Sequence, residues 1–199
     1  MISQLLRGLQ RFATPPRLLV LLPSVLVILL SLNFLNLPFS IPRLREISGG
    51  RTILDLRFFY SSDEAYRTLD AFGPGGRFTY LWGLATVDAV LPALMALLLA
   101  VTLVLVLKGV IPATSAWQRL CLVPILGALA DYCENAAIIT LLLRYPTRLE
   151  AVATAAGWFT LTKQVVTLLC VSMIAVGSVA RMTTWLKGTS CHSVASPEM

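Results

Sequence analysis

The stretch LCLVPILGALADYCENAAIITLLL, residues 120–143, carries charged side chains only at Asp131 and Glu134. It is longer than the about 20 residues that an α-helix needs to cross the hydrocarbon core of a bilayer. A charge at the middle of such a helix costs about 2.5–3.5 kcal/mol on insertion scales. We therefore predict a membrane-spanning helix whose acidic side chains face other protein segments and not lipid.

Three further segments are long and apolar enough to span a membrane, which predicts an all-α, polytopic membrane protein with four transmembrane helices in a single domain. The expected spans are residues 17–37, 79–107, 120–143 and 152–180. The first span follows three arginines, as the core of a signal peptide would. Its apolar core exceeds the roughly 7–15 residues typical of a signal peptide, and no small-residue cleavage site follows it. We expect it to be retained.

The composition agrees with a membrane protein. Hydrophobic residues make up 57% of the 199 residues and charged residues only 13%, whereas soluble domains carry roughly 25% charged residues. The net charge of +6 does not indicate nucleic-acid binding. The Lys and Arg residues flank apolar runs instead of forming a basic stripe with interleaved aromatic residues.

The cysteine and histidine residues predict no metal site and no cofactor. The cysteines are Cys121, Cys133, Cys170 and Cys191, and none of them forms a C-x-x-C pair. The single histidine, His192, cannot supply paired haem ligands. We expect the three cysteines inside apolar segments to be structural thiols.

The basic flanks of the spans favour a multi-pass membrane protein with both termini in the cytoplasm. Arginines are also frequent in residues 38–78, but there they can pair with acids of the same segment, namely Glu46, Asp55, Asp63, Glu64 and Asp70. Residues 38–78 are then an extracytoplasmic loop, and residues 188–199 a flexible tail.

Within this loop, the sequence predicts a short amphipathic helix that lies on the outer membrane surface or caps the bundle. Ser61 and Glu64 have the spacing of a capping box, and the segment GPGG, residues 73–76, ends the helix. Between these signals, apolar residues recur at helical spacing at Ala65, Leu69 and Phe72. A connector folded onto the bundle is the simpler alternative.

Six charged or amide side chains lie inside the second, third and fourth predicted spans, and they form the candidate site. These are Asp88 in the second span, Asp131, Glu134 and Asn135 in the third, and Lys163 and Gln164 in the fourth. With a rise of about 1.5 Å per residue, Glu134 and Lys163 fall at the same depth, roughly 4–5 Å to the outer side of mid-membrane. Asp131 falls near the middle, and Asp88 lies roughly 8 Å outward.

The polar residues of the third span share one face. Asp131, Glu134 and Asn135 are spaced i, i+3 and i+4, which places them on one side of a helix. Thr160 and Lys163 lie on a matching face of the fourth span. We predict that the two faces meet inside the bundle and that Glu134 and Lys163 form an ion pair.

Three acids and one lysine leave an excess of two negative charges, so at least one acid is expected to be protonated or to face water. Two interpretations follow. The cluster is either a satisfied polar network that fixes the register of the helices, or a protonatable or cation-binding site.

Enzymatic interpretations are less well supported. The chain has no G-x-S-x-G, HExxH or P-loop motif. Two aspartates in a small four-span protein are reminiscent of lipoprotein signal peptidases, but the motifs that surround the catalytic pair of that family are absent. We assign no catalytic residue and expect a non-enzymatic binding or assembly module. The alternatives are a small proton- or cation-coupled transporter and, third, an intramembrane aspartyl-type hydrolase. The expected partners are the lipid bilayer and a second membrane protein or a second copy of the chain.

Four motifs carry a resemblance to a known family. They are LDLRFFYSSDEAYRTLDAFGPGGRFTY (54–80), TVDAVLP (86–92), DYCEN (131–135) and TLTK (160–163). In this combination the chain resembles a family of small bacterial membrane proteins with four spans, no assigned activity and a D-x-x-E-N motif in the third span. The resemblance covers roughly residues 53–165. It implies the same architecture and a shared polar site, and it implies no activity.

Overall fold

The computed structural model describes residues 2–108, 110–112 and 115–192. Its elements are α1 (Ile2–Phe12), α2 (Pro15–Phe34), α3 (Ile41–Ile47), the 3₁₀ helix η1 (Leu54–Leu56), α4 (Ser62–Leu107), the 3₁₀ helix η2 (Ala116–Leu122), α5 (Val123–Arg144) and α6 (Glu150–His192). Four helical segments are long and apolar enough to cross a membrane, namely α2, α4, η2 with α5, and α6 as far as Thr184. The predicted all-α class and the four long apolar helices are confirmed.

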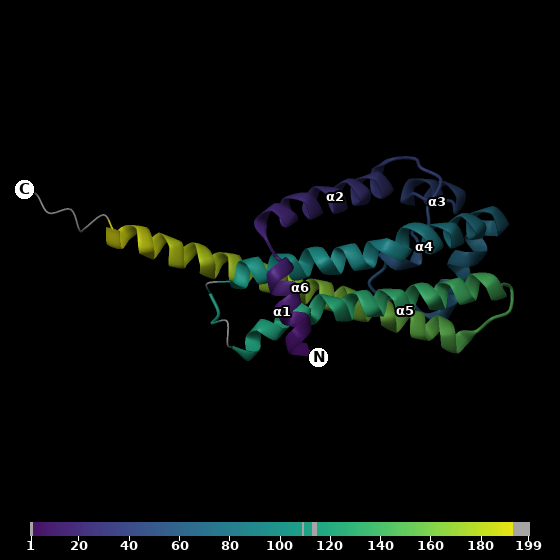
Figure 1. The fold of residues 1–199 in the computed structure, drawn as a ribbon. Coiled ribbons are helices and arrows are strands. Elements are labelled where there is room, and N and C mark those ends of the chain that lie inside the picture. Colours follow the sequence, from purple (N-terminus) through teal and green to yellow (C-terminus); the bar gives the residue numbers. More distant parts are fainter. Residues whose placement is uncertain (1, 109, 113–114, 193–199) are drawn as a thin grey trace, which may run out of the picture.

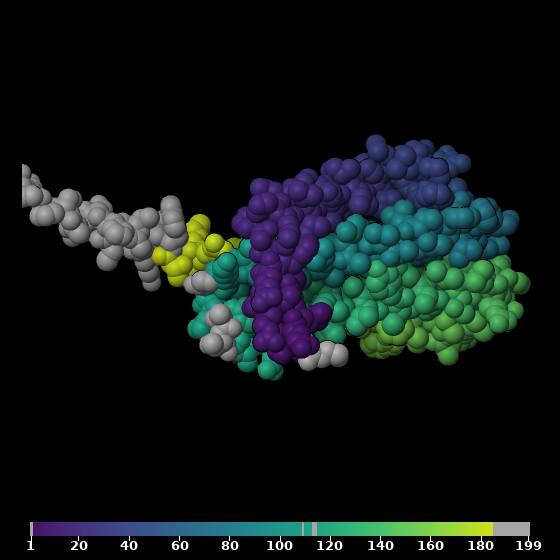
Figure 2. Space-filling model, viewed as in Figure 1, coloured from purple at the N-terminus to yellow at the C-terminus, as the bar shows by residue number. Residues whose placement is uncertain are grey.

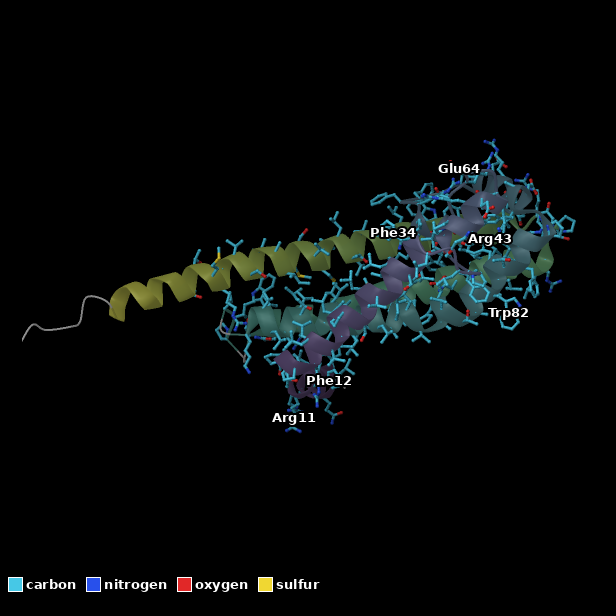
Figure 3. The ribbon with its side chains drawn as sticks, turned by 90° about the horizontal axis from the view of Figure 1, so that it is seen from above. Arg11, Phe12, Phe34, Arg43, Glu64 and Trp82 are labelled. Atoms are coloured by element: carbon cyan, nitrogen blue, oxygen red, sulfur yellow. The ribbon has the colours of Figure 1, made fainter. Side chains whose placement is uncertain are left out.

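Helices α4, α5 and α6 pack against one another and form the centre of the molecule (Figure 1). Helix α2 packs on α4 at the edge of this bundle, and only its residue Val25 is fully buried. Helix α1 lies across the bundle instead of along it (Figure 2). Figure 3 shows Arg11 and Phe12 toward one end of the bundle, and Arg43, Glu64 and Trp82 grouped toward the other. These are called the α1 end and the loop end below.

The structure changes several predicted boundaries. The sequence analysis did not anticipate α1 or α3, and the helix of the second span extends outward to Pro74 instead of beginning at residue 79. A flexible tail was expected over residues 188–199. Residues 188–192 instead belong to α6, and residues 193–199 lie outside the part of the chain that the structure describes.

The long helix α4 consists of two helical pieces that meet at Gly73. This glycine has φ 58° and ψ −177°, a left-handed conformation that disfavours residues with a side chain, and Pro74 begins the second piece where a proline is well tolerated. The first piece starts with a capping box, in which Ser61 accepts from the backbone N–H of Glu64 and the Glu64 carboxylate accepts from the N–H of Ser61. Residues 62–72 are thus a short helix of their own, and Gly73 joins this helix to the long second piece of α4.

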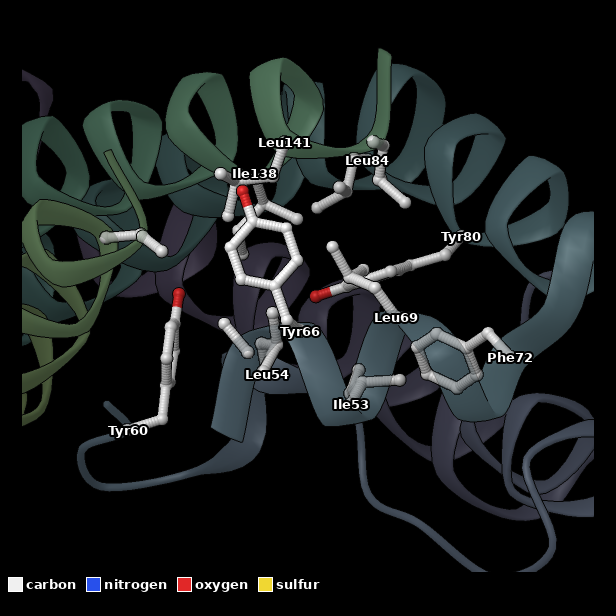
Figure 4. Close-up of a cluster of buried hydrophobic side chains, with 14 of the residues drawn as sticks. Ile53, Leu54, Tyr60, Tyr66, Leu69, Phe72, Tyr80, Leu84, Ile138 and Leu141 are labelled. Atoms are coloured by element: carbon white, nitrogen blue, oxygen red, sulfur yellow. The ribbon is translucent and has the colours of Figure 1, made fainter. Parts of the chain in front are cut away.

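A hydrophobic cluster at the loop end joins the loop to the bundle. Its largest members are aromatic and aliphatic side chains from the loop, α4 and α5 (Figure 4): Leu54, Tyr60, Tyr66, Leu69, Phe72, Tyr80, Leu84, Ile138 and Leu141. Gly157 of α6 belongs to the same contact, because a Cβ at this position would collide with the backbone carbonyl oxygen of Tyr60. The loop is therefore seated on the bundle and covers its polar interior.

A second hydrophobic cluster lies at the α1 end and includes Cys121 and Cys170, both fully buried. These two cysteines act as small apolar side chains, whereas Cys133 is exposed. Much of the outer surface of the long helices is apolar, with exposed side chains such as Leu19, Val20, Phe34, Leu126, Leu143, Leu168 and Val176. A water-soluble protein rarely exposes so large an apolar surface, whereas a lipid-facing surface requires it.

Candidate functional site

The ammonium group of Lys163 is the centre of the polar cluster. Its Nζ atom lies 2.6 Å from Oε2 of Glu134 and 3.0 Å from Oδ1 of Asp131. The predicted Glu134–Lys163 ion pair is therefore confirmed, and Asp131 is a second partner that the depth estimate did not single out. The i and i+3 positions on α5 place both carboxylates toward the same point on α6.

Glu134 is completely buried, and both of its oxygens have a partner. Oε1 accepts a hydrogen bond of 2.5 Å from the hydroxyl of Thr160, which lies one turn before Lys163 on α6. Oε2 faces the Lys163 ammonium. A buried carboxylate that is paired and hydrogen-bonded in this way avoids most of its desolvation penalty. Thr160, Lys163 and Glu134 together form a satisfied interhelical contact between α5 and α6.

Asn135 contacts α4, whereas the sequence predicted that its face of the helix meets the fourth span. Its side-chain amide donates to the backbone carbonyl of Asp88, with an N···O distance of 3.2 Å. Pro92 lies four residues after Asp88 and has no N–H, so it cannot make the helical hydrogen bond to this carbonyl. The hydroxyl of Tyr132 likewise donates to the carbonyl of Ala89, at 3.0 Å. Asn135 and Tyr132 therefore stabilise the proline site of α4.

The carboxyl group of Asp88 lines the same cavity as Asp131 and Lys163. Within the described part of the chain, the Asp88 carboxyl has neither a hydrogen bond nor an ion pair. Asp88 is thus a half-buried acid without a partner among the described residues.

Asp55 is the cluster member that sequence reasoning missed. The sequence analysis placed it among loop acids that pair with loop arginines, but η1 turns it inward. Its Oδ2 atom accepts a hydrogen bond of 2.8 Å from the hydroxyl of Tyr80. Its Oδ1 atom is buried and finds no partner among the described residues. Burial raises the pKa of the Asp55 carboxyl above its ordinary value of 3.8, and the nearby Lys163 charge and the Tyr80 hydroxyl oppose that rise.

One signal in the sequence pointed toward Asp55, namely its apolar neighbours on both sides. Asp55 stands between Leu54 and Leu56, and Leu54 is completely buried in the structure. Tyr80, at the start of the second predicted span, is buried and reaches from α4 into the loop-end cluster (Figure 4).

The remaining predicted residues lie outside the cluster. The side-chain amide of Gln164 donates to the backbone carbonyl of Arg57, at 3.4 Å, and so holds the loop. Ser61 and Glu64 are exposed at the start of α4, where Glu64 also faces Arg57 at 3.8 Å. Gln164, Ser61 and Glu64 therefore shape the loop that covers the site, and they do not line it.

The polar cluster borders a cavity of about 160 Å³ between α2, the loop and the three-helix bundle. Its polar lining consists of Asn33, Asp55, Asp88, Asp131 and Lys163, and its apolar lining includes Leu29, Leu32, Ile53, Val87 and Leu91. In the part of the chain that the structure describes, no group of three or more His, Cys, Asp or Glu side chains is arranged to hold a metal ion. The arrangement suits hydrogen-bond donors or a single positive charge better than a multivalent metal.

The comparisons with known proteins find no matching protein family, no similar curated protein and no similar solved structure.

Proposed function

We propose that this protein is a non-enzymatic membrane binding module whose cavity takes a small, singly charged organic cation. The observation that carries the proposal is the presence of two acids with unused oxygens beside a lysine that is already paired. Asp88 and Oδ1 of Asp55 have no partner among the described residues, whereas Lys163 contacts both Glu134 and Asp131.

The balance of charge supports this assignment. One ammonium group faces four carboxyl groups, since Asp55 joins the three acids of the spans. Glu134 and Asp131 together carry one negative charge more than Lys163 balances. Asp55 and Asp88 add two further acids that form no ion pair among the described residues. A buried carboxylate without a partner costs several kcal/mol, on the order of what protonation or a bound cation would restore. The cavity is therefore suited to accept a positive charge.

The lining favours an alkylammonium group over a hydrated metal ion. An ammonium group offers hydrogen-bond donors to the free carboxyl oxygens, and the leucine and valine side chains of α2 and α4 suit a short alkyl part. Larger ligands would not fit a volume of about 160 Å³. The class of ligand is thus a small primary amine in its charged form.

Binding is tested on purified protein in detergent by thermal unfolding with ethylammonium, sodium or potassium chloride at equal ionic strength. We expect ethylammonium to raise the melting temperature more than the two metal salts, because a ligand of the native state stabilises it by mass action. Asp88→Asn should remove this difference. Glu46→Gln is the matched control, since its side chain is 63% exposed and, among the described residues, pairs only with Arg43. Equal shifts with all three salts, or an unchanged shift in Asp88→Asn, would refute the proposal.

A small proton- or cation-coupled carrier is the second candidate. It is supported by α2, which forms one wall of the cavity although Val25 is its only fully buried residue. A loosely packed wall is the element that a carrier would move. Flux of ethylammonium or protons into liposomes, compared for the wild type and Asp88→Asn, separates the two functions. Binding without flux supports the module, and flux that Asp88→Asn abolishes supports the carrier.

We also propose the bacterial inner membrane as the location, with both termini in the cytoplasm, so that the α1 end is the inner end. Basic residues at the α1 end support this orientation. Residues 62–72 then cap the outer side of the bundle, because Ala65 and Leu69 are fully buried in the loop-end cluster. Impermeant labelling of Ser62→Cys in intact cells tests the orientation, and absence of labelling would reverse it.

A further inference from the structure

We infer that a groove beneath α1 binds an anionic phospholipid, with an acyl chain in the groove and the phosphate beside Arg17. The groove lies at the opposite end of the bundle from Asp55, so the inference is independent of the function proposed for the acidic cavity. Four features of the α1 end support the inference: the groove, the two faces of α1, the position of Arg17 and the distribution of charge.

The groove has a volume of about 600 Å³ and an almost entirely apolar lining. Its walls come from α1, α4 and the start of α5: Gln4, Leu5, Gly8, Leu9, Phe12, Ala96, Leu97, Ala100, Leu122 and Ile125. Gln4 is the one polar side chain of this set. Such a lining suits the hydrocarbon part of a lipid and offers little to a polar ligand.

Helix α1 has the form of an interfacial helix. It lies across the bundle (Figures 1 and 2), and its Leu6 and Leu9 pack on the apolar cluster of the α1 end. Ile2 and Leu5 are on the apolar side as well but remain exposed, at 59% and 54%. Arginines occupy the opposite side of the helix. A helix of this kind lies in the boundary between headgroups and acyl chains, so its uncovered apolar residues face lipid.

Arg17 places a positive charge at the edge of the groove. Its guanidinium carbon lies 4.3 Å from the ring centroid of Phe12, which lines the groove, and its Nη1 atom donates to the Phe12 carbonyl at 2.6 Å. These two contacts fix the guanidinium while the side chain remains exposed. Arginine binds phosphate oxygens with two parallel donors, so the remaining donors of Arg17 suit a lipid phosphate.

The charges of the α1 end favour an anionic lipid over a zwitterionic one. The basic side chains there are Arg7, Arg11, Arg17, Lys108, Arg119 and Arg181. Among the described residues, the acidic side chains lie in the loop, in the polar cluster or at Glu150, and none accompanies this group. Each basic residue near an anionic membrane surface contributes about 1 kcal/mol. The uniform charge therefore selects a negatively charged headgroup.

Gly8 provides a variant that fills the groove and spares the fold. A Cβ at this position would meet no atom within 4 Å, so a larger side chain can extend into the open groove. Replacing glycine within a helix also favours helix formation. Ser3→Leu is the matched control, because it adds the same side chain on α1 at an exposed residue that does not line the groove.

The experiment measures phospholipid binding by native mass spectrometry. Protein that has been stripped of lipid in detergent is titrated with dioleoyl phosphatidylglycerol or dioleoyl phosphatidylcholine. We expect the wild type and Ser3→Leu to bind phosphatidylglycerol more tightly than phosphatidylcholine. Gly8→Leu should bind both lipids less tightly. In Arg17→Gln, the ratio of the affinity for phosphatidylglycerol to that for phosphatidylcholine should fall about fivefold, which corresponds to the contribution of one basic residue.

Two results would overturn the inference. Equal binding of the two lipids by the wild type would exclude selection by charge, and wild-type binding by Gly8→Leu would place the lipid elsewhere. Ala96→Leu fills the groove from the α4 wall and serves as the second variant if Gly8→Leu does not fold. Circular dichroism of each variant separates loss of binding from loss of structure.

Discussion

The side-chain amide of Asn135 donates to the backbone carbonyl of Asp88 at the position where Pro92 removes the helical donor. This contact explains why an amide is present in the middle of a long apolar helix beside Asp131 and Glu134. A carbonyl exposed to hydrocarbon without a donor would cost several kcal/mol. Asn135 of the D-x-x-E-N motif thus has a structural role of its own. Asp131 and Glu134 of the same motif instead form ion pairs with Lys163.

Asn135→Ala should destabilise the protein because it leaves the Asp88 carbonyl without its donor. Interhelical hydrogen bonds of this kind contribute about 0.5–2 kcal/mol in membranes. The measurement is the free energy of unfolding in mixed micelles. In a Pro92→Ala background, the N–H at position 92 can bond to the carbonyl, so the cost of Asn135→Ala should fall. An equal cost in both backgrounds would show that Asn135 acts in another way.

Lys163→Met should cause a large loss of stability, because it leaves the buried Glu134 and the half-buried Asp131 without a positive charge. Breaking one partner of a buried ion pair costs roughly 3–5 kcal/mol. The double variant Lys163→Met with Glu134→Gln should recover only part of the loss, since Asp131 also contacts Lys163 at 3.0 Å. Adding Asp131→Asn should recover more.

The control for this series is Glu46→Gln, which removes an exposed acid and should leave stability nearly unchanged. Melting temperatures of all variants in one detergent provide the measurement. Full recovery in the double variant would show that Asp131 does not depend on Lys163. Additive losses would show that Glu134 and Lys163 are not coupled.

The features that the sequence predicted well are those that depend on local geometry. The four long apolar helices follow from the length of the apolar segments, and the Glu134–Lys163 contact follows from helical spacing and equal depth. The helical spacing of the apolar residues Ile2, Leu5, Leu9 and Phe12 also predicts helix α1. With 11 residues, however, α1 is too short to qualify as a membrane span.

The features that the sequence could not predict depend on the path of the loop. Asp55 reaches the cluster only because residues 54–60 pack closely against α6. This close packing requires the absence of a side chain at Gly157. No local pattern encodes a contact between residues so far apart in the chain.

Gly157→Ala should loosen the loop from the bundle, because the added Cβ collides with the carbonyl oxygen of Tyr60. Overpacking of this kind costs roughly 1–3 kcal/mol. We expect faster protease cleavage within residues 54–60 while the spans remain inserted. Gly75→Ala is the matched control, because a Cβ there meets no atom within 4 Å. Equal protection of the wild type and Gly157→Ala would contradict the close approach.

The pH dependence of stability should report on Asp55. Burial raises the pKa of this carboxyl in the folded protein above 3.8, in spite of the Lys163 charge and the hydrogen bond from Tyr80, while Asp131 adds to the rise. The folded state therefore holds the proton more tightly than the unfolded state does, and stability is lost as the pH increases from about 4 through the raised pKa. Asp55→Asn cannot lose a proton at this position. As the pH rises over this range, the melting temperature of Asp55→Asn should therefore increase relative to that of the wild type, whereas that of Glu46→Gln should not. A difference between Asp55→Asn and the wild type that is the same at pH 4 and pH 8 would mean that Asp55 is not buried in the cluster.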